Sequence, residues 1–211
     1  MESTDRSPRQ ARSRRTMERL LAATISLIDA KGLAGVTIPA IAAAAGLSTG
    51  SVYRRFADKD TLIKTAFLQL LEASQAANQA SLPPDRFQAA SLDEALQALS
   101  RALVAQYQGR TTLLRALDQY LEAQTDERFR DRAVDMIESN MRQVALTLLP
   151  FRDRIPAADP ERAITFALLS ATTLIEVHKL HNPLLWRRML PLDDDALARE
   201  AARMMAAYLA L

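Results

Sequence analysis

Apolar residues recur along this chain every three or four positions, which is the repeat of an amphipathic helix. In the first such segment, from about Thr16 to Ala30, the recurring positions are Met17, Leu20, Leu21, Thr24 and Ile28. Runs of β-branched residues at the two-residue period of a strand are missing, and the abundant Ala and Leu are strong helix formers. The pattern therefore predicts an all-α protein.

The same repeat predicts six longer helices in the rest of the chain. Their expected ranges are about 58–80, 91–108, 110–124, 126–149, 159–180 and 193–209. Pro83 and Pro84 break the chain after the first of them. We place a domain boundary inside the helix of residues 58–80, with one domain at 16–64 and a larger one at 65–211, because a continuous helix would connect the two mechanically.

Shorter elements are predicted between Thr37 and Leu62. One short helix is expected to begin at Thr37 and a second at Ser48, because Thr and Ser are preferred at helix N-caps. Gly46 lies between them, where glycine adopts a left-handed conformation at little cost. The next helix begins at Asp58. This order is the layout of a helix-turn-helix reader of DNA.

Charge is distributed unevenly along the chain. The formal net charge is +2, but residues 1–64 hold 11 Lys and Arg against six Asp and Glu, whereas residues 65–211 hold 16 against 19. Positive charge therefore gathers at the predicted helix-turn-helix, as binding to phosphate requires. Residues 1–15 are expected to form a disordered basic arm, which either touches DNA or is a solvated tail.

The composition excludes several kinds of site. Without cysteine the chain has no disulfide, no thiolate nucleophile and no cysteine-ligated metal. It has no P-loop and no dinucleotide-binding glycine pattern, so we expect neither an enzyme nor a cofactor. His178 and His181 are more typical of a helix end than of a metal site, and we expect no metal. We find no apolar run near the ~18 residues of a membrane span and no signal peptide, so we expect a cytoplasmic protein without a membrane partner.

The helix-turn-helix stretch resembles the DNA-binding domain of the TetR family of transcriptional regulators. The resemblance covers about Met17 to Lys64 and rests on Thr37, Ile41, Ala42, Ala45, Gly46, Leu47, Ser48, Gly50, Val52, Tyr53, Phe56, Lys59 and Leu62. It implies a three-helix DNA-binding domain joined by the helix of residues 58–80 to a larger helical domain for ligand binding and dimerisation. The rest of the chain matches the family only in length and helical character.

The resemblance implies a role for each matching polar residue. Phosphate contacts would come from Thr37, Tyr53 and Lys59. The entry of the recognition helix would hold Ser48, Thr49, Gly50 and Ser51, and Arg54 and Arg55 would reach the major groove or the flanking backbone. Arginine can pair bidentately with guanine, so at least one of the two could recognise a base. Pro39 and Ala40 depart from the family, in which a basic residue is common at this place.

Two features of the larger domain bear on partners. Small residues in the helix of residues 159–180 permit a close helix crossing, either in a two-fold dimer or in a monomeric core. The expected dimer residues are Ala163, Ala167, Ser170, Ala171, Ala201, Met204, Met205 and Tyr208. A small-molecule effector, as the family usually binds, is expected to meet Leu103, Tyr107, Arg115, Leu117, Gln119, Tyr120, Met136, Met141, Phe166 and Thr173, although an apolar stripe is more often plain core.

These expectations converge on a sequence-specific DNA-binding regulator. The resemblance favours a homodimeric repressor that binds double-stranded DNA at a palindromic operator and is released by a small molecule. The alternative is an activator, or a DNA-binding protein that needs no effector.

Overall fold

The computed structural model describes residues 8–83, 85–87, 90–181 and 184–210, and this part of the chain is helical and contains no strand. The α-helices are α1 (Pro8–Lys31), α2 (Ile38–Ala44), α3 (Thr49–Tyr53), α4 (Lys59–Ser81), α5 (Leu92–Ala105), α6 (Thr111–Glu122), α7 (Glu127–Leu146), α8 (Pro160–Glu176), α9 (Leu184–Met189) and α10 (Asp194–Leu209). Two 3-10 segments, η1 (Leu33–Gly35) and η2 (Leu149–Arg154), and a π-helical segment, η3 (Val177–His181), complete them. The all-α prediction is confirmed.

Side-chain caps set where most helices begin. In each case a side-chain oxygen accepts a hydrogen bond from the backbone N–H three residues further on, which satisfies a donor that has no partner inside the helix. The capping residues are Thr37, Ser48, Asp58, Ser91, Asp126, Asp159 and Asp193. The caps predicted at Thr37 and Ser48 are therefore present.

The amino-terminal helix is longer than the sequence suggested. α1 begins at Pro8, so residues 8–15 are helical and the prediction of disorder was wrong for them. Proline fits the first turn of a helix because no intrahelical bond is lost there, and Arg14 forms an ion pair one turn away with Glu18 at 3.5 Å. Residues 1–7 of the predicted arm lie outside the described residues. The short helix α9 was not predicted either, because six residues are too few to show a repeat.

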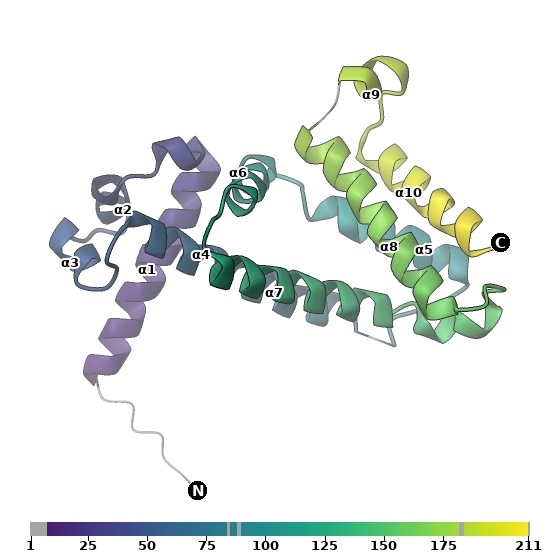
Figure 1. The fold of residues 1–211 in the computed structure, drawn as a ribbon, viewed down its shortest axis with the longest axis horizontal. Coiled ribbons are helices and arrows are strands. Elements are labelled where there is room, and N and C mark those ends of the chain that lie inside the picture. The colour runs from purple at the N-terminus through teal and green to yellow at the C-terminus, as the bar shows by residue number, and fades with distance from the viewer. Residues whose placement is uncertain (1–7, 84, 88–89, 182–183, 211) are drawn as a thin grey trace, which may run out of the picture.

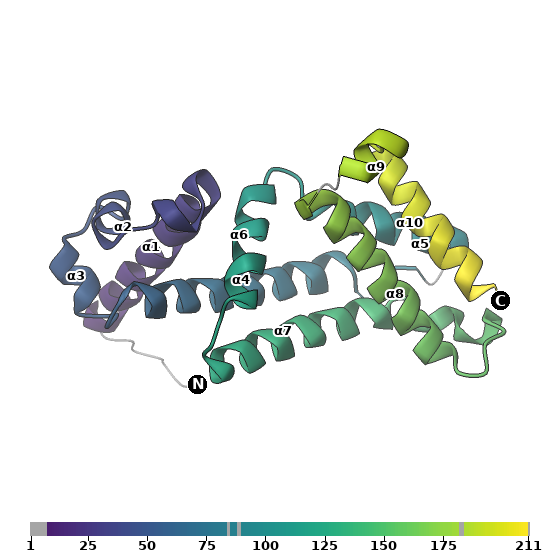
Figure 2. The same ribbon diagram turned by 45° about the horizontal axis from the view of Figure 1, so that its top comes forward.

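The helices form an elongated molecule (Figure 1). α1, α2 and α3 lie at one end, and α8, α9 and α10 lie at the other. α4 and α7 run side by side between the two ends (Figure 2). Two side-chain hydrogen bonds join them, from Gln75 to Ser139 at 3.1 Å and from Asn78 to Asn140 at 3.0 Å. α4 is one continuous helix, as expected, and it leads from the amino-terminal unit into the larger one.

Buried apolar residues form two cores that divide the chain differently from the predicted boundary. The first core combines α1–α4 with α6 and the start of α7, through residues such as Leu113, Leu117 and Phe129. The second combines α5, the end of α7, η2, α8 and α10. Ala66 and Phe67, beyond the boundary placed at residue 64, belong to the first core. α6 therefore packs directly against the amino-terminal unit.

The segment from Pro160 to His181 is long and apolar enough to cross a membrane by length and composition, with 22 residues and a mean hydropathy of 1.3 in its most apolar stretch. The expectation that no such run exists was therefore wrong. One face of α8 is buried in the second core through Ile164, Leu168 and Ile175. Its opposite face exposes Phe166 and Leu169. A core helix with one exposed apolar face accounts for the composition.

Candidate nucleic-acid interface

The turn between α2 and α3 is fixed by Gly46 and by a side chain from α1. Gly46 has φ of 61°, a left-handed conformation that disfavours residues with a Cβ. Arg19 donates from Nη2 to the carbonyl of Ala45 and, at 3.4 Å, to that of Gly46. A Cβ on Gly46 would lie 2.8 Å from that nitrogen. No sequence pattern signals this role of Arg19, because its contacts lie 26 and 27 residues away.

Apolar residues hold α3 in place on one side and leave its other side free. Val52 and Phe56 are 0% and 4% exposed and pack in the first core with Ile41 of α2. On the outer side, Tyr53 is 59% exposed, and Thr49, Gly50 and Arg54 are exposed as well. The structure thus gathers these predicted DNA-contacting residues on one surface.

Hydrogen bonds in and around α3 orient the polar side chains of this segment. Ser48 accepts from the backbone N–H of Ser51 at 3.2 Å, and the two hydroxyl oxygens are 3.0 Å apart. Arg54 donates to the Ser51 hydroxyl at 2.7 Å, and Arg55 donates to the Ser51 carbonyl at 3.3 Å. Ser51 and Arg55 are half-buried and are therefore less accessible to solvent than Tyr53 and Arg54.

The other two predicted phosphate contacts lie at helix starts. Thr37 is exposed and accepts from the N–H of Ala40 at 3.2 Å. Lys59 is exposed next to Asp58, which accepts from the N–H of Thr61 at 2.7 Å. That backbone hydrogen bond lowers the pKa of Asp58. At each of these helix starts, one backbone N–H is thus already bonded to the capping side chain. The Lys59 ammonium is the cationic group at the start of α4.

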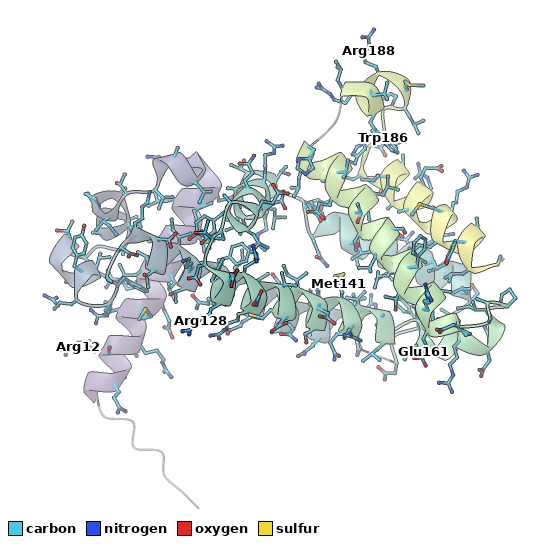
Figure 3. The ribbon with its side chains drawn as sticks, in the orientation of Figure 1. Arg12, Arg128, Met141, Glu161, Trp186 and Arg188 are labelled. Carbon is cyan, nitrogen blue, oxygen red and sulfur yellow. The ribbon has the colours of Figure 1, made fainter. Side chains whose placement is uncertain are left out.

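Further arginines lie on the first turns of α1. Arg12, Arg14 and Arg15 are exposed there. Figure 3 places Arg12 toward the amino-terminal end of α1, at the same end of the molecule as α2 and α3. Because residues 8–15 are helical, these arginines project from a helix.

Comparison with known proteins decides the class of this unit. The model of the bacterial regulatory proteins of the tetR family matches residues 20–66, a range that contains α2, α3, the start of α4 and most of the residues just described. Over this range the chain is similar to the TetR family. The fold of the whole chain is shared with solved proteins described as TetR-family transcriptional regulators.

TetR-family proteins resemble this chain in part of the sequence and in the whole fold. The HTH-type transcriptional regulator BetI of Stenotrophomonas maltophilia is 46% identical over 54 residues, which is 26% of this chain and 28% of BetI. The match therefore spans little more than a quarter of that relative. A protein of Mesorhizobium loti assigned to the TetR family superposes with a TM-score of 0.71 at 21% identity, over 94% of this chain and 97% of its own. FadR of Bacillus subtilis, solved with stearoyl-CoA, gives 0.64 at 14% identity, over 89% and 96%.

The larger unit contains a cavity of about 380 Å³. Its walls come from α4, the α5–α6 connection, α6, one residue of α7, and the junction of α8 with η3. Apolar side chains dominate α4 and α6 there, among them Phe67, Leu70 and Leu114. The volume is in the range of small-molecule sites, about 300–1,000 Å³.

The predicted effector residues are spread over the cavity, the second core and the surface. Of the ten predicted residues only Tyr107 and Leu117 line it. Leu103 is 3% exposed in the second core, and Met141 packs against the same core. Gln119, Phe166 and Thr173 are exposed outside the cavity, and Met136 is half-buried outside it. Arg115 donates to the Leu180 carbonyl at 2.6 Å, and Tyr120 donates to Asp60. The apolar repeat predicted which residues face the protein interior, but not which of them line a cavity.

Three polar groups of the cavity influence one another. Burial raises the pKa of Glu176, and the charge of Asp118 raises it further. Burial, then the charges of Glu176 and Asp118, raise the pKa of Tyr107, so its hydroxyl stays protonated. His181 Nε2 lies 3.8 Å from Asp118. Asp118 was not among the predicted effector residues. Glu176 was considered as a polar anchor beside Arg115 and Gln119, but its spacing fits a plain surface position equally well.

Most of the predicted dimer residues are buried within their own chain. Ala163, Ala167, Ala171, Ala201 and Met205 are at most 6% exposed and lie in the second core of their own chain, so a partner cannot reach them. Met204 and Tyr208 are exposed, and Ser170 is half-buried. The ring of Phe166 lies 5.0 Å from that of Tyr208. The small residues thus serve the close packing of α8 within the subunit.

A polar network joins the start of α4 to α6 and α7. Tyr120 of α6 donates to Asp60. Lys64 forms ion pairs with Asp60 at 2.8 Å and Asp126 at 2.7 Å. The Lys64 hydrogen bond lowers the pKa of Asp126, and that of Lys64 is raised in turn. Burial opposes ionisation of Asp60, but its bonds to Lys64 and Tyr120 outweigh it, and its pKa is lowered.

Proposed function

We propose that this protein is a homodimeric repressor of a palindromic operator, and that a small molecule in the cavity of the larger unit releases it from DNA. The observation that carries the DNA-binding part is the exposed surface of α3, where Tyr53 and Arg54 project from a helix anchored by Val52 and Phe56. Tyrosine hydroxyl and guanidinium groups suit phosphate oxygens and guanine edges. Such a protein acts in the cytoplasm, where the DNA is.

The exposed apolar face of α8 and α10 supports the dimer. Phe166 is 56% exposed, Leu169 48% and Tyr208 41%, on two helices that lie side by side at one end of the molecule (Figure 2). Exposed apolar patches mark interaction sites. In a two-fold dimer, two copies of α8 and α10 would form a four-helix contact, with both copies of α3 available for half-sites about 34–36 Å apart.

The position of the cavity supports release by an effector. α4 contributes one wall and also leads into the helix-turn-helix, while α6 contributes a second wall and packs on α1. A ligand that favours another placement of α4 or α6 would change the separation of the two copies of α3. FadR, with its bound stearoyl-CoA, shares this fold. The cavity favours this mechanism over a DNA-binding protein that needs no effector.

The experiment is selection of bound duplexes from a random DNA pool, followed by gel-shift titration of the selected sequence. We expect a palindrome with half-sites about one helical turn apart and an affinity at least about 10³-fold above that for nonspecific DNA at physiological salt. Enrichment of no sequence would refute the proposal. Reporter output after deletion of the gene separates a repressor, whose loss raises expression, from an activator.

A further inference from the structure

The charged side chains that line the cavity are mostly negative. Among its lining residues, Glu176 and Asp118 carry carboxylates, and Arg110 is the cation. Arg110 is exposed and also borders a separate, shallower hollow between α1 and α4, so it lies at the rim. The interior side of the cavity is therefore acidic.

Glu176 lacks a compensating partner. It is half-buried, and within the described part of the chain it forms no ion pair and no side-chain hydrogen bond. Burial disfavours its ionised form, as do the charges of Asp118 and Glu122, whereas the charge of His181 favours that form. A carboxylate withdrawn from water without a hydrogen bond or a counter-charge is costly. Such a group in a cavity is satisfied when a cation binds.

The rest of the cavity lining offers an apolar surface. Leu70 and Leu71 of α4, Leu114 and Leu121 of α6, and Ile137 of α7 face the same space as Glu176. Burial of alkyl groups against these side chains removes apolar surface from water and favours binding. A ligand that used the whole cavity would combine a positive head with an apolar body.

We propose that the cavity binds an amphiphilic organic cation, with a quaternary or protonated amine beside Glu176 and Asp118 and an alkyl or aryl body against α4 and α6. The inference deepens the proposed effector role and rests on it. It places the ligand between α6 and the π-helical turn η3, where the Leu180 carbonyl already accepts from Arg115. An anionic amphiphile would instead face two carboxylates in the interior and find Arg110 only at the rim.

The test is calorimetric titration of the full-length protein with three probes that share one alkyl chain and differ in the head group: decyltrimethylammonium, decanoate and 1-decanol, all below micelle-forming concentrations. We expect saturable binding of about one decyltrimethylammonium per chain, at least about tenfold tighter than either other probe. Tighter binding of decanoate, equal binding of all three, or no binding of the cation would overturn the inference.

Matched variants assign the effect to the cavity. Glu176→Gln keeps size and hydrogen bonding, removes the repulsion with Asp118, and should weaken cation binding by about tenfold or more. Glu176→Asp should retain most of the binding. Glu122→Gln is the control, because Glu122 is exposed on α6 and does not line the cavity. Equal losses in Glu176→Gln and Glu122→Gln would reject the assigned site.

Operator binding, measured in the same samples by fluorescence anisotropy, keeps the two proposals apart. If the cation binds through Glu176 but leaves operator affinity unchanged, the ligand class stands and release by an effector fails. If the cation does not bind while the operator is still bound, this inference fails and the DNA-binding function stands.

Discussion

Single residues set the geometry of the DNA-binding surface. Arg19 ties α1 to the turn between α2 and α3, and Gly46 gives that turn its left-handed backbone. Ser51 accepts from Arg54 and so holds one guanidinium near the α3 surface before any DNA arrives. Preorganised side chains lose less entropy on binding than free ones. The affinity for DNA should therefore also depend on Arg19 and Gly46, which are not among the predicted contact residues.

Replacement of Gly46 by Ala tests this dependence. Gly46→Ala should destabilise the fold by about 1–2 kcal/mol through its left-handed backbone, and should also weaken DNA binding, because the new Cβ displaces Arg19. Gly109→Ala is the matched control, since Gly109 has φ of 68° and a Cβ added there would meet no other side chain within 4 Å. Chemical denaturation and DNA anisotropy measure the two effects. Equal losses of DNA affinity in both variants would contradict the role of Arg19.

The residue scale is also where sequence and structure agree best at the site. Thr37, Ser48 and Gly46 take the caps and the turn expected of them, because each depends on interactions within a few residues. Arg19, Asp118 and Glu176 acquire their contacts from helices far away in sequence. A helical repeat assigns a residue to a face, but the neighbour of that face depends on the packing of the whole chain.

Among the elements, α6 links the cavity to the helix-turn-helix. It lines the cavity with Leu114, Leu117 and Asp118, and through Tyr120 it contacts Asp60 in the first turn of α4. The sequence pattern suggested a mechanical connection through the helix of residues 58–80 alone. The repeat predicted α6 as a helix but did not reveal that it packs on α1.

Removal of the Tyr120 hydroxyl should weaken the coupling between ligand and DNA. Tyr120→Phe loses one hydrogen bond to a partly exposed carboxylate, a stability effect of about 1 kcal/mol. The larger expected effect is a smaller loss of operator affinity when ligand is added. Tyr53→Phe is the control for stability, because the Tyr53 side chain is exposed on α3. An unchanged ligand response in Tyr120→Phe would show that the network does not transmit it.

The same network predicts a dependence of stability on acid. The lowered pKa values of Asp60 and Asp126 mean that their contribution to folding is present above their ordinary pKa near 4 and is lost as the pH falls through the lowered values. Lys64→Met removes the cation that lowers them. The unfolding free energy of this variant should fall less steeply between about pH 5 and pH 3 than that of the parent, as measured by urea denaturation. Parallel curves would mean that Lys64 does not stabilise the ionised carboxylates.

At the scale of the whole molecule, the proposed dimer brings two DNA-binding surfaces together. The α8–α10 face lies at the end opposite α2 and α3 (Figure 1). A change in the orientation of the subunits there would be carried along α4 and α7 to both copies of α3. The repeat of small residues in α8 predicted a close helix crossing, and this crossing exists within the subunit. Only some of the exposed residues beside the crossing were among the predicted dimer residues.

A charge on the α8 face should separate the subunits. Phe166→Glu places a carboxylate beside Leu169 and Tyr208 and should convert the dimer to a monomer that binds the operator at least about 100-fold more weakly, because a monomer engages one half-site. Val134→Glu, at an exposed apolar residue of α7, is the control and should remain dimeric. Analytical ultracentrifugation gives the oligomeric state. A dimeric Phe166→Glu protein would move the interface elsewhere.

The central claim is that α3 inserts its exposed polar face into duplex DNA. The most direct measurement is the affinity of the triple variant Tyr53→Phe, Arg54→Ala, Arg55→Ala for the selected operator, at several salt concentrations including the physiological one. Its folding and oligomeric state are checked in parallel. We expect a loss of at least about 100-fold and a shallower salt dependence, since phosphate contacts and at least one base contact are removed. A correctly folded triple variant that binds the operator as tightly as the parent, with the same salt dependence, would contradict the account.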